Sequence, residues 1–235
     1  MQIRLDRLIS EAGAVPRQEA KKLVMTGCVT VDGLVVKKCD HKTDIASEVH
    51  LNGKKIVYET FVYIMLNKPK GVVSASKDKN DTTVTDLVAE KFPRRQLFPA
   101  GRLDKDSTGF VLLTDDGQFA HDILAPKKHV EKTYIVTLDA PITDEIVEKF
   151  NNGVVLADGT ELKSAVLERL EGDFIVRVVL KQGVYHQIKR MFGVFDIGVN
   201  ELHRIRIGNL PLDENLQPGG FKQLTNEDVQ KIYTR

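Results

Sequence analysis

The chain has 235 residues, of which 42% are hydrophobic and 29% are charged, a composition typical of globular proteins. Its 34 Lys and Arg residues almost balance its 33 Asp and Glu residues, so a nucleic-acid partner would have to be held by a local basic patch. The longest apolar run, Phe61–Leu66, is far shorter than the roughly 20 residues that span a bilayer, and the N-terminus has no signal-peptide core. We therefore expect a cytoplasmic protein with one large domain, or a small domain and a larger one.

The N-terminal quarter of the chain predicts two helices followed by short strands. Apolar residues recur at helical spacing in Leu5–Ala12, and a second apolar stripe follows Pro16 and stops at Gly27. The pairs Asp32-Gly33 and Asn52-Gly53 then separate short apolar runs, which predicts two β-hairpins with tight turns.

The rest of the chain, from residue 61, is expected to be rich in strands with helices between them. The strands expected are Val62–Leu66, Thr133–Leu138, Ala165–Leu170 and Phe174–Leu180, and the helices are Thr83–Phe92, Gln118–Leu124, Thr143–Phe150, His186–Phe192 and Asn226–Tyr233. Because strands and helices do not alternate strictly, we expect an α+β fold with a mixed, mainly antiparallel sheet and flanking helices.

Two regions have the charge and loop content of a nucleic-acid contact surface. Residues 67–105 carry nine basic residues against five acidic ones, and loops of this kind display groups that contact phosphate. The two N-terminal helices carry or adjoin Arg4, Arg7, Arg17, Lys21 and Lys22. The alternative interpretation of both regions is an ordinary solvated surface.

The loop Gly101–Gly109 is the main candidate for chemistry. Its two glycines enclose a short stretch of alternating charge that leads into the apolar strand Phe110–Leu113. Asp104 lies between Arg102 and Lys105, and nearby positive charge keeps a carboxylate ionised. It is therefore suited to act as a nucleophile or a base, while a surface turn with a local ion pair is the alternative.

A second cluster, Gly183–Phe192, places His186, Gln187 and two cations at the start of an expected helix. The six histidines show no metal-binding spacing, and no glycine-rich motif for a nucleotide is present. Cys28 and Cys39 are expected to be small, partly buried apolar groups. We therefore expect chemistry without a metal or cofactor.

Residues 3–51 resemble an S4 RNA-binding domain, and the chain from about residue 61 to its end resembles the RsuA group of pseudouridine synthases. The S4-like residues are Arg4–Ile9, Gly13, Pro16-Arg17, Ala20, Leu23, Gly27, Val29–Val31 and Asp32-Gly33. The synthase-like motifs are Leu66–Gly71, Gly101–Phe110, Leu112–Gly117, Glu131–Tyr134, His186–Met191 and Arg206–Leu210. The resemblance implies an S4 domain at residues 1–60 and a catalytic domain at residues 61–235.

The resemblance further implies an isomerase that converts a specific uridine of ribosomal RNA to pseudouridine without a cofactor. By this resemblance we expect Asp104 to be the essential carboxylate, which attacks C1′, attacks C6 of the base, or promotes elimination to a glycal. Tyr134 stacks on the uracil and takes part in proton transfer, and Lys189 pairs with Asp104, with Arg190 as the alternative. Arg102 contacts the RNA or fills the gap left by the extruded base. The further RNA-binding residues are Arg4, Arg7, Arg17, Lys21, Lys22, Lys68, Lys70 and Arg190.

Two departures from the family pattern concern the second cluster. Val184 stands where the family commonly has Arg, and Lys189 stands where Arg is usual; Lys can pair with a carboxylate but lacks the bidentate fork.

The Tyr185-His186-Gln187 motif favours an enzyme that acts on small-subunit ribosomal RNA or on an assembly intermediate of that subunit. We expect this enzyme to be a monomer. The alternatives are a large-subunit enzyme and a catalytically silent RNA-binding or ribosome-assembly protein. Asp106 and Asp115 or Asp116 are interpreted as structural, turn-capping groups.

Overall fold

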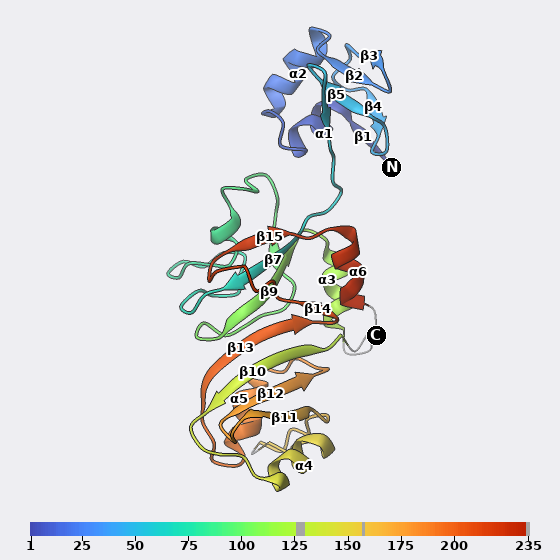
Figure 1. Cartoon of the computed structure of the whole chain (residues 1–235). Coiled ribbons are helices and arrows are strands. Elements are labelled where there is room, and N and C mark those ends of the chain that lie inside the picture. Colours follow the sequence, from blue (N-terminus) through green and yellow to red (C-terminus); the bar gives the residue numbers. More distant parts are fainter. Residues whose placement is uncertain (126–129, 157, 234–235) are drawn as a thin grey trace. The chain divides into compact units, whose positions relative to one another are not determined.

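The computed structural model describes residues 1–125, 130–156 and 158–233 (Figure 1). Contacts divide the chain into two compact units. Unit 1 consists of residues 1–61 together with 92–95, and unit 2 consists of residues 62–91 and 96–235. Among the described residues, no helix has the length and apolar character needed to cross a membrane.

Unit 1 contains two helices and two small antiparallel sheets. Its elements are β1 (Gln2–Arg4), α1 (Leu5–Glu11), α2 (Arg17–Met25), β2 (Val29–Val31), β3 (Leu34–Val35), β4 (Lys42–Asp44), β5 (Val49–Leu51) and β6 (Lys54–Ile56). β1 pairs with β4, and the other sheet has the strand order β3-β2-β5-β6. Both expected helices and both hairpins are confirmed, and Asp32 and Asn52 take the left-handed conformation, each with φ 50°, that tight hairpin turns require.

The core of unit 1 forms where the apolar face of α1 meets α2 and the second sheet. It contains Ile3, Leu5, Leu8, Ile9, Ala20, Val24, Val29, Val31 and Val49. Asp6 is also fully buried, and its carboxylate accepts hydrogen bonds from Arg4 and Arg17. Burial raises the pKa of the Asp6 carboxyl, but the two arginines outweigh this effect and hold the pKa below 3.8. The Asp6 cluster therefore ties the start of α1 to α2.

Unit 2 contains one large sheet and helices around it. Its elements are β7 (Tyr63–Lys68), the 3-10 helix η1 (Asp86–Val88), β8 (Phe98–Pro99), β9 (Thr108–Thr114), α3 (Gly117–Leu124), β10 (Lys132–Leu138), α4 (Asp144–Asn152), β11 (Val166–Glu171), β12 (Ile175–Leu180), α5 (Gln187–Gly193), β13 (Val199–Ile207), β14 (Leu210–Pro211), β15 (Phe221–Gln223) and α6 (Asn226–Tyr233). The four expected strands and four of the five expected helices lie within about two residues of these bounds.

In the part of the chain that the structure describes, the sheet of unit 2 has nine strands. Seven follow the order β11-β12-β10-β13-β9-β7-β15, β8 pairs with β9, and β14 pairs with β13. Every pairing is antiparallel except the one between β9 and β13. The expected α+β class with a mixed, mainly antiparallel sheet is confirmed. The parallel pairing joins a half around β7 and β9 to a half around β10 and β12.

Each half of the sheet has its own helices (Figure 1). α3 and α6 pack on the half that contains β7 and β9, in a core that includes Met65, Phe110, Phe119 and Ile232. On the other half, α4 and α5 come together through Phe150 and Phe192, whose ring centroids are 4.7 Å apart. Asp116 caps α3 by accepting from Phe119 N, and Asp115 accepts from Val62 N, so the structural interpretation of both aspartates is confirmed.

The expected helix at Thr83–Phe92 is wrong, because η1 is the only helical element there in the described chain. The backbone of Thr83 forms a parallel bridge with Val73, and the Asp86 side chain accepts from both the N–H and the hydroxyl of Thr83. Side-chain bonds of this local kind compete with helix formation. Strand β13 was not expected, because a buried Arg204 interrupts the apolar alternation of its inward face.

Candidate active site

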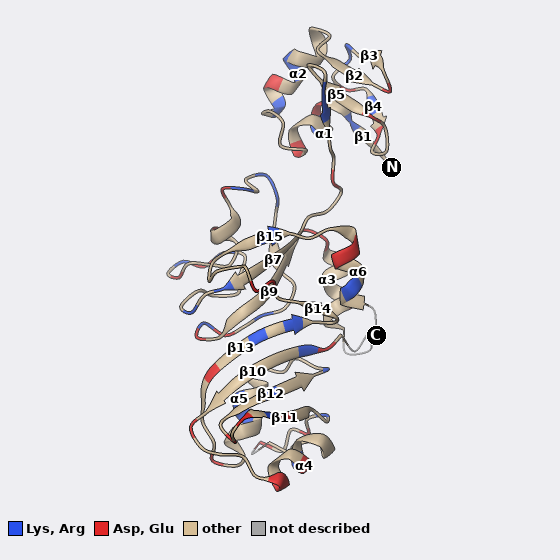
Figure 2. Ribbon diagram, viewed as in Figure 1, with Lys and Arg blue, Asp and Glu red and all other residues tan. Residues whose placement is uncertain are grey.

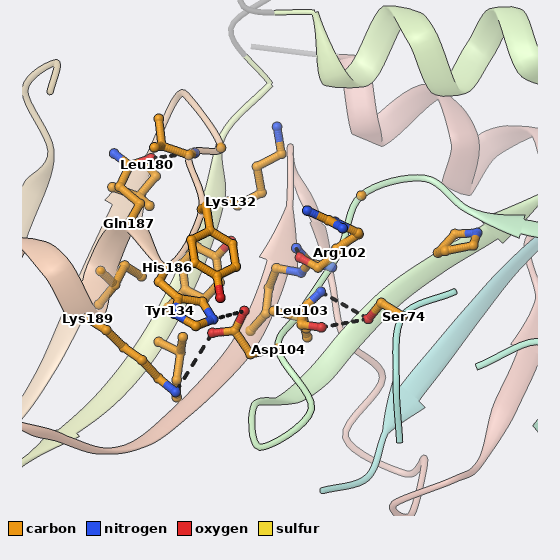
Figure 3. Close-up of a pocket in the computed structure, with 18 of the residues that line it drawn as sticks. Ser74, Arg102, Leu103, Asp104, Lys132, Tyr134, Leu180, His186, Gln187 and Lys189 are labelled. Carbon is orange, nitrogen blue, oxygen red and sulfur yellow. Dashed lines mark hydrogen bonds and ion pairs between the residues drawn. The ribbon is translucent and has the colours of Figure 1, made fainter. Parts of the chain in front are cut away.

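A cavity of about 790 Å³ in unit 2 lies at the parallel junction between the two halves of the sheet (Figure 3). One wall comes from residues 73–75 and the loop 99–105, and the other from β10, β13 and the segment 180–189. Among the residues that line it are Asp104, Tyr134, His186, Lys189 and Arg204. Residues from distant parts of the chain therefore meet at one site.

Asp104 lies in the loop between β8 and β9, and two groups at the start of α5 approach its carboxylate. His186 Nε2 is 3.3 Å from Asp104 Oδ1, and Lys189 Nζ is 3.8 Å from Asp104 Oδ2. Arg190, the alternative partner, instead pairs with Asp158 at 2.5 Å. Figure 3 shows Asp104, Tyr134, His186 and Lys189 converging from a loop, a strand and a helix.

Arg102 and Lys105 were expected to place positive charge beside Asp104. The groups that approach its carboxylate come from the start of α5 instead. The Lys105 ammonium turns away from Asp104 and pairs with Asp81 at 2.7 Å. Arg102 is exposed at the cavity wall and has no ion pair with Asp104 among the described residues. The alternative interpretation, a surface turn with a local ion pair, does not account for this geometry, because the Asp104 carboxylate faces a cavity that other elements line.

Two buried side chains from the preceding segment hold the Asp104 loop. Ser74 Oγ donates to Leu103 O at 2.8 Å and accepts from Leu103 N at 3.0 Å. The Lys68 ammonium donates to Ser107 O at 2.7 Å and to Lys105 O at 3.1 Å. The loop is thus clamped on both sides of Asp104.

The expected RNA contact of Lys68 is wrong. Its side chain is fully buried, and its ammonium is occupied by backbone carbonyl groups. Burial lowers the pKa of Lys68 to about 8, although the carboxylates of Asp104 and Asp106 act in the opposite direction. Lys68 therefore belongs to the support of the loop, whereas Lys70, two residues later, is exposed.

Tyr134 lies on β10 in a row of residues that crosses the junction of the sheet. It is opposite Arg204 on β13, which in turn is opposite Gly109 on β9. The Arg204 guanidinium lies 5.9 Å from the centre of the Tyr134 ring, and its Nε donates to Phe110 O at 2.6 Å. A Cβ on Gly109 would be 2.3 Å from Arg204 O, so the close approach of β9 and β13 requires glycine here.

Comparison with protein families identifies the architecture around this site. The model of the family described as RNA pseudouridylate synthase matches residues 62–193, more than half of the chain. The chain belongs to the RNA pseudouridylate synthase family. A model of the S4 domain also matches residues 3–41. The resemblance deduced from sequence motifs is confirmed, and the chain is an RNA pseudouridine synthase, an isomerase.

Individual relatives match almost the full length of this RNA pseudouridine synthase. A protein of Aquifex aeolicus named as an uncharacterized RNA pseudouridine synthase is 42% identical over 231 residues, which are 98% of this chain and 96% of that one. The ribosomal small subunit pseudouridine synthase A of Escherichia coli strain K12 is 40% identical and covers 98% of this chain and 100% of its own. A crystal structure of a pseudouridylate synthase matches with a TM-score of 0.68 and 37% identity over 98% of this chain and 99% of that chain.

The cavity of this synthase is strongly basic. Its lining includes Arg102, Lys105, Lys132, Lys189 and Arg204, whereas Asp104 is the acidic residue of that lining. Burial lowers the pKa of Lys132 to about 8, and the charge of Arg204 acts in the same direction. Figure 2 shows basic residues on β10 and β13, the strands that carry Lys132 and Arg204. A site with this excess of positive charge suits a polyanion such as RNA.

The five basic residues expected to bind RNA in unit 1 are all exposed. They are Arg4, Arg7, Arg17, Lys21 and Lys22. Arg4 and Arg17 also bond to Asp6, and Arg7 forms an ion pair with Glu11 at 2.7 Å. Three of the five side chains therefore take part in ion pairs within unit 1 while remaining accessible to solvent.

Three contributions to the site were not predicted from the sequence. Ser74 carries no motif of its own, and its partner Leu103 lies far along the chain. Arg204 belongs to a strand that was not expected. His186 was noticed as part of a cluster, but its approach to Asp104 depends on the fold. Among the described residues, which do not include His129, no group of His, Cys, Asp and Glu could hold a metal ion.

Proposed function

We propose that this synthase isomerises a specific uridine of small-subunit (16S) ribosomal RNA to pseudouridine and that Asp104 is its essential carboxylate. The observation that carries the proposal is the position of Asp104, in a basic cavity and between His186 and Lys189. The small-subunit substrate is supported by the Escherichia coli relative, whose name specifies that subunit and which matches over its full length.

The reaction balances without a cofactor. The bond between N1 of uracil and C1′ of ribose breaks, a bond between C5 and C1′ forms, C5 loses a proton and N1 gains one. Asp104 contributes by attacking C1′, by attacking C6, or by promoting elimination to a glycal. Tyr134 is nearly buried beside it, where it stacks on the base and takes part in the proton transfer. Lys189 balances the charge of the Asp104 carboxylate.

The target uridine must leave its RNA stack to reach Asp104. Extrusion of a base costs a few kcal/mol, less for an unpaired nucleotide. Stacking of the uracil on Tyr134 would return ~1–3 kcal/mol, and the cavity of about 790 Å³ has room for a nucleotide. Arg102, exposed at the cavity wall, contacts the RNA or fills the gap that the base leaves.

Binding of the remaining RNA is shared between the two domains, residues 1–60 and 61–235. The exposed basic residues of α1 and α2 hold a neighbouring RNA element through phosphate contacts, and Lys70 and Arg190 extend the contact on the catalytic domain. The enzyme acts as a cytoplasmic monomer on small-subunit RNA or on an assembly intermediate of that subunit.

The test is the release of tritium from small-subunit ribosomal RNA labelled at C5 of uridine, because C5 loses its hydrogen in the reaction. Wild type is expected to release one equivalent per target, and Asp104→Asn none. The matched control is Asp106→Asn, because Asp106 is an exposed aspartate in the same loop; this variant should react like wild type.

Three results would contradict parts of the proposal. Release from large-subunit RNA alone would assign the enzyme to the other subunit. Full activity of Asp104→Asn would remove the proposed carboxylate. Tight binding of both RNAs without any release would contradict the reaction on ribosomal RNA.

A further inference from the structure

His186 is the group closest to the proposed catalytic carboxylate among the ion pairs of the described residues. Its Nε2 lies 3.3 Å from Asp104 Oδ1, whereas Lys189 Nζ lies 3.8 Å from Asp104 Oδ2. The two oxygens of Asp104 therefore have different partners, the planar imidazole of His186 on Oδ1 and the ammonium of Lys189 on Oδ2. A lysine at 3.8 Å neutralises charge without fixing the plane of a carboxylate, since this distance exceeds the hydrogen-bond range.

The backbone of His186 adopts a conformation that few side chains occupy. It lies in the left-handed region, with φ 51° and ψ 32°, immediately before α5. The neighbouring contacts hold it there: Gln187 is buried, its side-chain Oε1 accepts from Val184 N, and its own N–H donates to Val184 O. His186 O then accepts from Arg190 N in the first turn of α5. The turn directs the His186 side chain into the cavity, which is the kind of site where such backbone strain is found.

The imidazole ring is also restrained. Tyr185 stacks on it with ring centroids 3.8 Å apart and an interplanar angle of 18°. Tyr185 itself is 67% exposed, so it contributes little to the core, and its ring stacks on that of His186. Backbone conformation, ring stacking and the contact with Asp104 thus all determine the position of one imidazole (Figure 3).

We propose that His186 is a positioning residue that donates its Nε2–H to Asp104 Oδ1 when RNA occupies the cavity and so directs Oδ2 toward the reacting nucleotide. Hydrogen bonds of catalytic groups are often long in the free enzyme and tighten in the substrate complex. The inference rests on the proposed role of Asp104. It adds a residue that acts through that carboxylate.

The test compares three substitutions at His186 in the full chain. His186→Gln keeps an N–H donor close to the position of Nε2, His186→Leu removes the donor, and His186→Asn tolerates the left-handed backbone but has a shorter side chain. Tritium release is measured in single turnover with enzyme in excess, and RNA affinity is measured separately. Gln and Leu are both less suited than Asn to the left-handed backbone of residue 186, so backbone strain is common to these two variants and the difference in rate between them reports the loss of the donor; thermal unfolding of each variant is measured in parallel.

We expect His186→Leu and His186→Asn to slow the single-turnover rate by at least 10-fold, His186→Gln to stay within 3-fold of wild type, and all RNA affinities to stay within 3-fold. The inference is overturned if the Leu variant keeps the wild-type rate, if Gln is as slow as Leu, or if Asn matches Gln. Asp104→Asn is measured in parallel: if it is active, the proposed function fails too, whereas an inactive Asp104→Asn with unaffected His186 variants refutes only the role of His186.

Discussion

Replacing Lys68 with Met tests whether a buried cation outside the cavity controls the geometry of Asp104. The Lys68 ammonium donates to Pro69 O, Lys105 O and Ser107 O at 3.2, 3.1 and 2.7 Å. An ammonium has three N–H groups, so each has one carbonyl acceptor. Met has a similar length and no donor, and Lys68→Met therefore removes the clamp while filling most of the space.

The loss of stability expected for Lys68→Met follows from the hydrogen bonds that the three carbonyl groups lose. A hydrogen bond to a charged donor contributes ~1.5–3 kcal/mol net, but removing Lys68 also removes the cost of burying its charge, the cause of its lowered pKa. Lys105 O keeps a second bond, from Gly71 N at 2.8 Å. We therefore expect unfolding to become easier by about 1–3 kcal/mol. A displacement of the loop by ~1 Å would slow the reaction about 100-fold.

The assay separates the chemical step from RNA binding. Lys68→Met should lose about two orders of magnitude in single-turnover tritium release and keep its RNA affinity. Lys70→Met is the matched control: it removes an exposed lysine two residues away and should weaken RNA binding while the single-turnover rate at saturating enzyme is kept. The proposed support of the Asp104 loop by Lys68 is contradicted if Lys68→Met reacts within 3-fold of wild type, or if its defect is one of RNA affinity.

The structure makes four further predictions. First, because burial lowers the pKa of Lys68 from 10.5 to about 8, the unfolded chain holds more protons between these pH values. In urea titrations the stability of wild type relative to Lys68→Met should thus rise from pH 8 to 10.5, by up to roughly 3 kcal/mol; a flat difference would contradict the assignment. Second, Ser74→Ala leaves the buried N–H and C=O of Leu103 without their partner, which should cost ~1–3 kcal/mol in urea unfolding and slow tritium release, with Ser76→Ala as the exposed control. Third, Gly109→Ala places a methyl group 2.3 Å from Arg204 O at φ +99°, and we expect a loss of more than about 2 kcal/mol, whereas a thermal midpoint equal to that of wild type would refute the close approach. Fourth, Asp6→Asn should destabilise unit 1 at neutral pH by about 1–3 kcal/mol, as followed by its backbone amide signals. Because the pKa of Asp6 is lowered from 3.8 in the folded state, this difference should shrink as the pH falls below 3.8 and disappear below the folded-state pKa, and its persistence in stronger acid would count against the ion pairs.

Local structure was largely readable from the sequence because it depends on residues close together in the chain. The apolar spacing of Leu5–Ala12 needs one neighbouring surface to form a helix, and Asp32-Gly33 makes a hairpin turn wherever the flanking strands go. The S4 and synthase motifs are likewise contiguous, so the order of residues along the chain is enough to recognise the family. The exception, Thr83–Phe92, has backbone groups that bond to Val73 instead of forming a helix.

The composition of the site was decided by tertiary structure. The residues around Asp104 already predict a short charged loop, but its partners are His186, just before α5, and Lys189 on α5, which the fold brings across the junction of β9 and β13. The choice of Lys189 over Arg190 follows from the side of α5 that faces the cavity, since Arg190 turns to Asp158. Lys68 looked like a surface lysine because sequence shows charge but not burial. Only the packed loop supplies the three carbonyl groups that make a buried ammonium acceptable there.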